Sequence, residues 1–219
     1  MTALINNFYL RHKNFWTRHS FFLLLTGIAW FLFAIIIQHF AYLYIDNHVD
    51  GTAVGDIFLN NLPALNLDFF IVQGALISTF LAICLFIVKP KYISFSLKTL
   101  ALFIVIRSFF ISLTHLGINL HQITLNTNSI GFSLYDFLYN AKNDFFFSGH
   151  VGAAYLFGLI FWRETFFRYL FFALACIFGA SMLFAHMHYS IDVFAAPFIT
   201  YAIYVIAQKV FYHDYKLLN

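Results

Sequence analysis

The chain has 219 residues, of which 62% are hydrophobic, 22% are aromatic and 10% are charged. A soluble domain of this length needs a more polar surface, so these proportions indicate a protein whose solvent is mostly lipid. The net charge of +3 is modest and spread along the chain, which argues against a nucleic-acid partner.

Six apolar runs have the length, or nearly the length, of a membrane-spanning helix, which needs about 17–25 residues. The sequence therefore predicts an all-α, polytopic membrane protein, with a six-transmembrane-helix bundle at residues 20–212 between short segments at 1–19 and 213–219. The fourth run is the shortest, and its glycines at 149, 152 and 158 suit close helix packing while lowering helix propensity. The first run could be a signal peptide, but it is too long and lacks a small-residue cleavage site. The runs are Ser20–Tyr44, Leu67–Val88, Leu97–Ile118, Ser148–Trp162, Phe166–His186 and Ser190–Tyr212.

The charged residues predict the orientation of this bundle. Basic residues precede the first run, join runs two to three and four to five, and follow run six, all of which fall on one side. The positive-inside rule then places both terminal segments in the cytoplasm and the other loops on the periplasmic, extracellular or lumenal face. The basic residues are Arg11, Lys13, Arg18, Lys89, Lys91, Lys98, Arg163, Arg168, Lys209 and Lys216, and the opposite loops hold Asp46, Asp50, Asp56, Asp68, Asp136 and Asp144 against Lys142.

Two short motifs place three chemically active side chains on that second face. His188 and Asp192 are four residues apart, so on a helix the carboxylate would hold one imidazole nitrogen and leave the other as a nucleophile. His150 follows Ser148 and Gly149 at a helix start, where free backbone N–H groups favour a bound phosphate. A histidine beside that phosphate can protonate a leaving lipid oxygen and later deprotonate an acceptor. Either motif alone is more often structural, but their convergence on one face predicts a catalytic site.

These motifs resemble the two catalytic motifs of sphingomyelin synthases, within the type 2 phosphatidic acid phosphatase superfamily. The resemblance rests on the segment Asn143-Asp144-Phe145-Phe146-Phe147-Ser148-Gly149-His150 and on the segment Ala185-His186-Met187-His188-Tyr189-Ser190-Ile191-Asp192-Val193. It extends upstream to Asp56-Ile57-Phe58 with Leu62-Pro63, and to Arg107 followed by Thr114-His115-Leu116.

The resemblance implies six spans and a catalytic triad of His150, His188 and Asp192, with a phosphohistidine at His188. It also implies the reaction, in which phosphocholine or phosphoethanolamine moves from a glycerophospholipid donor to ceramide or a similar lipid alcohol. No metal or other cofactor is required for this route. Whether the protein forms a homo-oligomer stays open.

One departure from the superfamily pattern bears on the substrate. Where the superfamily has Ser-Arg ahead of the nucleophilic histidine, this chain has Ser181 and Met182, and no lysine-to-Arg-Pro motif is convincing. This argues against a phosphatidate or diphosphate phosphatase, because a free phosphate monoester needs several cationic donors. A phosphodiester head group needs fewer. The alternative functions with the same site are a lipid phosphatase and a phospholipase C-type hydrolase.

Other residues are candidates for substrate binding. Ser148 and Gly149 would hold phosphate, and Tyr189 would position the motif. Arg107, near mid-membrane, could clamp the phosphate in place of an arginine at 182, or pair structurally with Asp56, Asp68 or backbone carbonyls. His115 is expected two turns beyond it on the same helix stripe, where it and His186 would more often be supporting residues. Tyr135, Tyr139, Phe145 or Tyr189 could hold a quaternary amine by cation–π attraction, and the connection Asn119–Asn143 could recognise the acceptor.

A hypothesis of a different class uses histidines as ligands of haem or a transition metal. It leaves the Ser-Gly before His150 and the Asp after His188 unexplained, so the enzyme is favoured. A third hypothesis is a descendant of the lipid enzyme that has lost catalysis. Cys84 and Cys176 lie within apolar runs and are expected to act as small apolar residues. The histidines of the ligand hypothesis are His39, His115, His150, His186 and His188.

Overall fold

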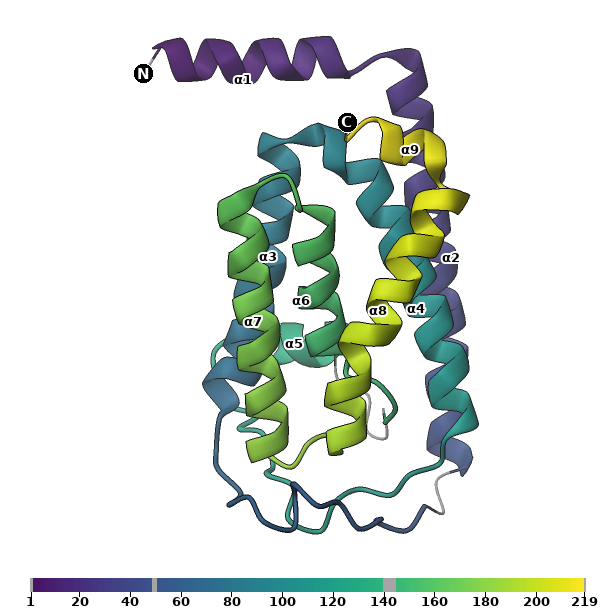
Figure 1. Ribbon diagram of the computed structural model, residues 1–219, viewed down its shortest axis with the longest axis vertical. Coiled ribbons are helices and arrows are strands. Elements are labelled where there is room, and N and C mark those ends of the chain that lie inside the picture. The colour runs from purple at the N-terminus through teal and green to yellow at the C-terminus, as the bar shows by residue number, and fades with distance from the viewer. Residues whose placement is uncertain (1, 49–50, 140–144, 219) are drawn as a thin grey trace.

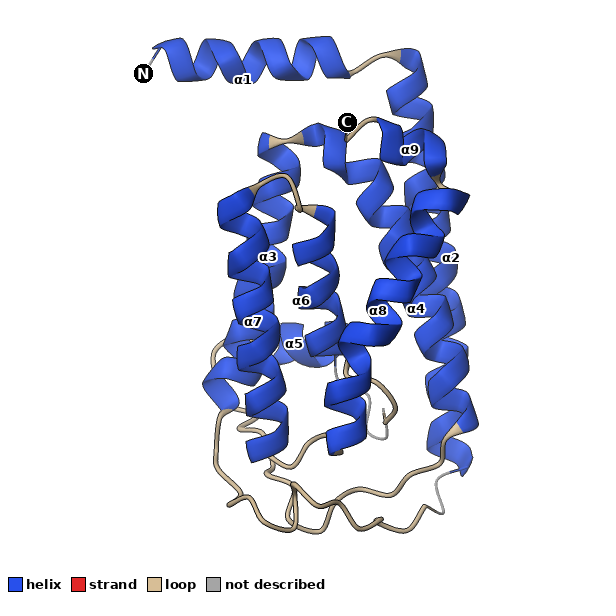
Figure 2. Ribbon diagram, viewed as in Figure 1, coloured by secondary structure: helices blue, strands red, loops and turns tan. Residues whose placement is uncertain are grey.

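The computed structural model describes residues 2–48, 51–139 and 145–218 (Figure 1). These residues form helices joined by loops and contain no strand, which confirms the all-α class (Figure 2). Asp50, Lys142, Asn143 and Asp144, used above for orientation and resemblance, lie outside the described residues.

Five helices among the described residues are long and apolar enough to cross a membrane, so the polytopic architecture is confirmed. The predicted fourth span is a shorter apolar helix of 12 residues, α6 (Gly149–Ile160). The five are α2 (Arg18–His48), the π-turn η1 (Phe69–Gln73) running into α3 (Gly74–Val88), the 3-10 turn η2 (Pro90–Tyr92) running into α4 (Ile93–Leu113), α7 (Thr165–Phe184) and α8 (Ser190–Val210).

The helices pack in two groups that meet where α4 contacts α8 and α6. In one group α2 lies along α4, and in the other α6 lies against α7 and α8, with further contact between α4 and α8 (Figure 1). Two glycines make α6 narrow enough for this place: a Cβ at Gly152 would lie 2.7 Å from the Phe103 ring, and one at Gly158 would lie 2.5 Å from the Phe172 ring. The predicted use of these glycines for close packing is confirmed.

The third predicted span is wrong at both ends. α4 begins at Ile93 and ends at Leu113, four and five residues before the predicted bounds. The helix stops because Thr114 is extended, with φ −113° and ψ 125°, and its hydroxyl donates to the Phe145 carbonyl across the bundle. His115 therefore lies in a loop and not on the helical stripe of Arg107.

Both terminal helices lie at one end of the bundle. α1 (Thr2–Phe15) crosses that end at a steep angle to the other helices, and α9 (Tyr212–Lys216) follows α8 there (Figure 1). The segment expected as a C-terminal tail is packed: Asp214 accepts from Lys98 Nζ at 2.7 Å, and both side chains are buried. The turns after α3 and α6 lie at this same end, where Arg11 donates to the Val88 carbonyl and Lys89 pairs with Glu164. The compartment that this end faces stays a prediction.

The opposite end is covered by the loops that follow α2 and α4 (Figure 1). The expected polar connection after α4 contains a short helix, α5 (Phe132–Tyr139), which packs against η1. Two bonds tie this connection to the start of α3: Gln73 Nε2 donates to the Ile130 carbonyl at 2.8 Å, and Asn126 N donates to Asp68 Oδ2 at 2.8 Å.

Candidate active site

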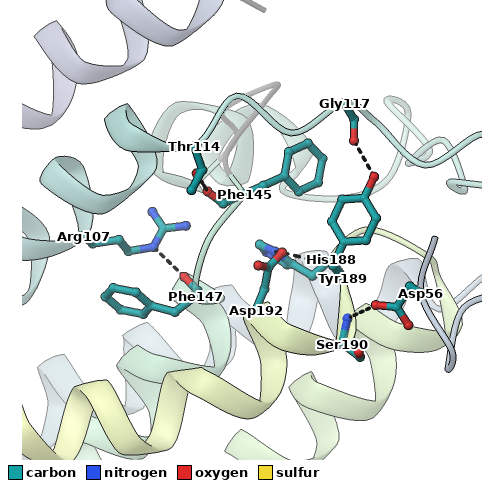
Figure 3. A network of polar contacts seen from close by, with 10 residues as sticks. All are labelled: Asp56, Arg107, Thr114, Gly117, Phe145, Phe147, His188, Tyr189, Ser190 and Asp192. Carbon is teal, nitrogen blue, oxygen red and sulfur yellow. Dashed lines mark hydrogen bonds and ion pairs between the residues drawn. The ribbon is translucent and has the colours of Figure 1, made fainter. Parts of the chain in front are cut away.

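The start of α8 orients His188. Asp192 Oδ2 accepts from Tyr189 N at 3.1 Å, as in a capping box, and also lies 3.2 Å from His188 Nδ1 (Figure 3). Because a carboxylate can only accept, Nδ1 is the donor and Nε2 is left for chemistry. The Asp192 side chain is fully buried, so its charge acts in a low-dielectric setting. His188 lies in the turn before the helix, and the structure brings it and Asp192 together as the spacing predicted.

The start of α6 is fastened to the same place. Ser148 N donates to the backbone carbonyl of Asp192 at 2.9 Å, which joins the beginnings of α6 and α8. The Ser148 hydroxyl is buried without a hydrogen-bond partner in the described structure and does not cap α6. Next along α6, His150 Nε2 lies 3.2 Å from the hydroxyl of Tyr135, which α5 supplies.

Arg107 reaches this helix start from α4. Its Nε donates to the Phe147 carbonyl at 3.1 Å (Figure 3), and a Cβ on Gly149 would meet the Arg107 guanidinium carbon at 3.1 Å. Phe146 and Phe147 have positive φ values of 90° and 32°, a conformation that costs energy in residues with a side chain. This strained turn aims the Phe147 carbonyl at the guanidinium. Of the roles considered for Arg107, a bond to a backbone carbonyl is thus present, and its guanidinium also faces the cavity described next.

Both imidazoles and the guanidinium line a single cavity of about 420 Å³. Its polar end holds His150, His188 and Arg107. Its volume is in the range of small-molecule sites, about 300–1,000 Å³. The other predicted residues on its wall are Gly149, Tyr135, Tyr139, Phe145 and Met182.

Two predicted binding residues lie away from this cavity. The Tyr189 hydroxyl donates to the Gly117 carbonyl at 2.8 Å and accepts from Val54 N at 3.2 Å, so it joins two outer loops (Figure 3). His115 is exposed, with its ring stacked 6.3 Å from that of His48. Neither side chain lines the cavity, so both lie where they can support the surrounding loops, and the substrate contact considered for them is not seen there.

Asp56 has a role that sequence reasoning did not assign. Its Oδ2 accepts from Ser190 N at 2.6 Å, so it caps α8 across 134 residues of sequence (Figure 3). Burial alone would raise the pKa of Asp56, but the backbone bonds from Ser190, Leu59 and Phe58 outweigh it and hold the pKa below its ordinary value of 3.8. The sequence did place Asp56 in one of the segments that resemble the family, but it gave no indication that its partner is the backbone of Ser190.

Gln38 and Tyr42 are further cavity residues that sequence reasoning missed. They lie one turn apart on α2, where Gln38 Nε2 donates to the Tyr42 hydroxyl at 2.7 Å, and Arg107 Nη1 lies 3.5 Å from that hydroxyl. A polar pair at i and i+4 within an apolar run is a signal that could have found them, because such residues usually face the interior of a bundle.

Of the five histidines in the ligand hypothesis, His150 and His188 share the cavity, whereas the other three do not line it. His39 is exposed on α2, and His186 Nε2 donates to the Leu62 carbonyl at 3.2 Å on the loop side. Within the described residues, no group of three or more His, Cys, Asp or Glu side chains is arranged to hold a metal ion.

Residues 143–209 match the family model described as PAP2 superfamily C-terminal. The matched segment covers α6, α7 and nearly all of α8, and it contains His150, His188 and Asp192. The match supports the type 2 phosphatidic acid phosphatase superfamily and an enzyme of the phosphatase or phosphotransferase type. A search of curated proteins finds no significant match to the chain.

Proposed function

From this relation to the type 2 phosphatidic acid phosphatase superfamily, we propose that the protein is a phospholipid head-group phosphotransferase like the sphingomyelin synthases. It moves phosphocholine or phosphoethanolamine from a glycerophospholipid to ceramide or a similar lipid alcohol. The observation that carries the proposal is that two imidazoles, one on α6 and one in the turn before α8, face one cavity, with Asp192 behind the second and the Arg107 guanidinium against Gly149, the residue before the first.

In the first step His188 Nε2 attacks the phosphorus of the donor lipid. A bond forms between nitrogen and phosphorus while the bond from phosphorus to the glycerol oxygen breaks, and His150 donates a proton to that oxygen so that diacylglycerol leaves. The phosphorylated His188 ring is cationic while Nδ1 keeps its proton. Asp192, at 3.2 Å from Nδ1, stabilises this charge.

In the second step the acceptor hydroxyl attacks the same phosphorus. His150, now neutral, takes the proton of this hydroxyl as the nitrogen–phosphorus bond breaks, and His188 is regenerated. Arg107 and the first backbone N–H groups of α6 offset the negative charge on the phosphoryl oxygens in both steps. The residues thus end the cycle in their starting protonation states.

The cationic lining favours a phosphodiester over a phosphate monoester. Met182 lies on the cavity wall where the superfamily has arginine. Among the described lining residues, Arg107 is the one arginine or lysine. One guanidinium suits the single negative charge of a diester better than the two charges of a monoester. Three aromatic rings near the imidazoles can hold a quaternary amine at the other end of the head group, namely Tyr135, Tyr139 and Phe145.

The surroundings of the cavity support a lipid acceptor. Its walls are mostly aliphatic and aromatic, and its polar end lies at the starts of α6 and α8, which are at the end of the bundle opposite α1 and α9 (Figure 1). A site with little water favours attack by a lipid hydroxyl over hydrolysis. With the basic end in the cytoplasm, the reaction takes place on the periplasmic, extracellular or lumenal side.

The experiment is head-group transfer by the purified protein in vesicles, with labelled phosphatidylcholine or phosphatidylethanolamine as donor and ceramide or diacylglycerol as acceptor. His188→Ala should lower transfer by more than about a thousandfold. His39→Ala is the matched control, because that imidazole is exposed on α2 and should leave the rate unchanged. Full activity of His188→Ala would refute the assignment of His188 as the nucleophile.

The products separate the alternatives. Head-group label should appear on the acceptor lipid and, after a quench without acceptor, on the protein as an acid-labile phosphohistidine. Free phosphocholine in place of a labelled lipid would identify a phospholipase C-type hydrolase. Inorganic phosphate released from phosphatidate would identify a lipid phosphatase.

A further inference from the structure

The cavity continues from the catalytic residues along the helices. On α4 its wall is the stripe Leu100, Phe103, Ile104 and Arg107, which are spaced as one face of a helix. Arg107 is at the end near the imidazoles, and the other three side chains, farther toward the α1 end, are apolar. This wall therefore changes from cationic to hydrocarbon within two turns.

The facing wall on α6 changes in the same direction. His150 begins the stripe, Ala153 follows one turn later and Phe157 one turn after that. α6 runs antiparallel to α4, so both polar ends meet at the imidazoles and both apolar ends point toward α1 (Figure 1). From His150 to Phe157 there are seven residues, a rise of about 10 Å, and the same rise separates Arg107 from Leu100. The apolar part thus extends about 10 Å along the helices.

The third wall, on α2, opens the cavity to lipid. Phe31, Ile35, Gln38 and Tyr42 form its stripe, with the polar pair again at the catalytic end. Ile35 lines the cavity on a membrane-spanning helix and is 40% exposed, so the cavity is not closed at this residue. In a bilayer this surface meets acyl chains, so a chain can pass into the cavity at Ile35 without crossing water.

We propose that this apolar part is a subsite for one hydrocarbon chain of the substrate lipid, and that Ala153 and Phe157 determine the chain length it accepts. The inference rests on the proposed function in one respect: the chain belongs to the lipid whose phosphate lies at His188. Ala153 leaves room beside the reacting phosphate because it has no side chain beyond Cβ. The Phe157 ring closes the far end, where it packs 5.4 Å from Phe171.

The test compares donors with dihexanoyl and dioleoyl chains. Ala153→Leu fills the cavity one helical turn from His150 toward the α1 end. The ratio of the dioleoyl rate to the dihexanoyl rate should therefore fall on the order of tenfold. Phe157→Ala opens the far end and should shift the preference toward longer chains. Ala173→Leu on α7 is the matched control, since Ala173 is exposed on the outer surface of the bundle and the same change there should leave the ratio unaltered.

A second readout needs no turnover. A phosphatidylcholine with a photoreactive diazirine in mid-chain should crosslink to the α2, α4 and α6 stripes in the parent protein. Ala153→Leu should give at least fivefold less of this crosslink while its thermal midpoint stays that of the parent. Equal ratios for Ala153→Leu and the control, or crosslinks confined to the outer helix surfaces, would overturn the chain subsite. Crosslinking at the stripes without any head-group transfer would leave the subsite standing and refute the proposed function.

Discussion

Replacing Asp192 by asparagine tests the reaction mechanism most directly. In the structure two donors, Tyr189 N at 3.1 Å and His188 Nδ1 at 3.2 Å, converge on the same oxygen, Oδ2. An asparagine whose carbonyl takes the Oδ2 position can accept from both, so it keeps the start of α8 and the imidazole tautomer. Its NH₂ group then takes the place of Oδ1, which has no hydrogen-bond partner among the described residues. The change therefore removes mainly the negative charge.

The size of the effect follows from the burial of that charge. A hydrogen bond to a charged group in a protein contributes about 1.5–3 kcal/mol, and the fully buried position of Asp192 favours the upper end. At about 1.4 kcal/mol for each factor of ten, loss of this stabilisation from the cationic phosphohistidine should lower kcat/KM on the order of a hundredfold. The carbonyl that replaces the carboxylate should preserve most of the stability.

The assay is head-group transfer under single-turnover conditions, with the thermal midpoint measured on the same samples. Asp46→Asn is the matched control, because Asp46 is exposed near the end of α2 and loses a charge without touching the cavity. A rate for Asp192→Asn within about threefold of the parent would refute the role of the carboxylate. A large loss in both variants would point to a general effect of net charge.

Two further predictions concern stability, measured as the thermal midpoint and free energy of unfolding in detergent. Asp56→Asn should cost about 1–2 kcal/mol at neutral pH, since it weakens the cap of α8. Because the pKa of Asp56 is lowered in the folded protein, the stability that its carboxylate contributes is complete above pH 3.8 and is lost as the pH falls below that value. The difference in free energy of unfolding between variant and parent should therefore disappear in acid. A difference that persists there would contradict the role of Asp56 as a cap. Lys98→Met should cost about 3–5 kcal/mol by leaving the buried Asp214 carboxylate alone, and adding Asp214→Leu should restore most of it. Transfer activity per folded molecule should be that of the parent in all of these variants. If the double variant did not regain stability, the loss in Lys98→Met would not come from the unpaired Asp214 carboxylate.

The sequence predicted best where polar residues interrupt apolar runs. Ser190 was predicted as the first residue of a span and is the first residue of α8, because the Asp192 side chain that caps this helix is part of the motif itself. The pairing of His188 with Asp192 was predictable for the same reason: it depends on four residues of local geometry. Local spacing also identified the glycines that let α6 approach its neighbours.

The sequence predicted poorly where a distant contact decides the outcome. The predicted run continues to Ile118 because Leu116 and Ile118 are apolar, but α4 stops early, where the Thr114 hydroxyl donates to the Phe145 carbonyl 31 residues away. The cap by Asp56 on Ser190 and the contact between Arg107 and Gly149 are likewise set by how helices pack. No periodicity in one segment contains that information, which is why Arg107 was left between two roles.

The shortness of α6 explains why these distant contacts gather around His150. At 1.5 Å per residue, its 12 residues extend about 18 Å from the turn at Arg163, whereas a hydrocarbon core is about 30 Å thick. With Ile160 near one edge of the core, the helix rises about 15 Å back to His150, so His150 lies about 15 Å below the other edge. The strained turn at Phe147, the loops after α2 and α4, and α5 with Tyr135 fill that depth. If α6 spanned the whole core, it would carry the imidazole to the membrane surface and into water. The proposed reaction site therefore lies within the bilayer because α6 is about two turns too short to cross it, and the missing turns are replaced by loop backbone that only tertiary contacts can hold.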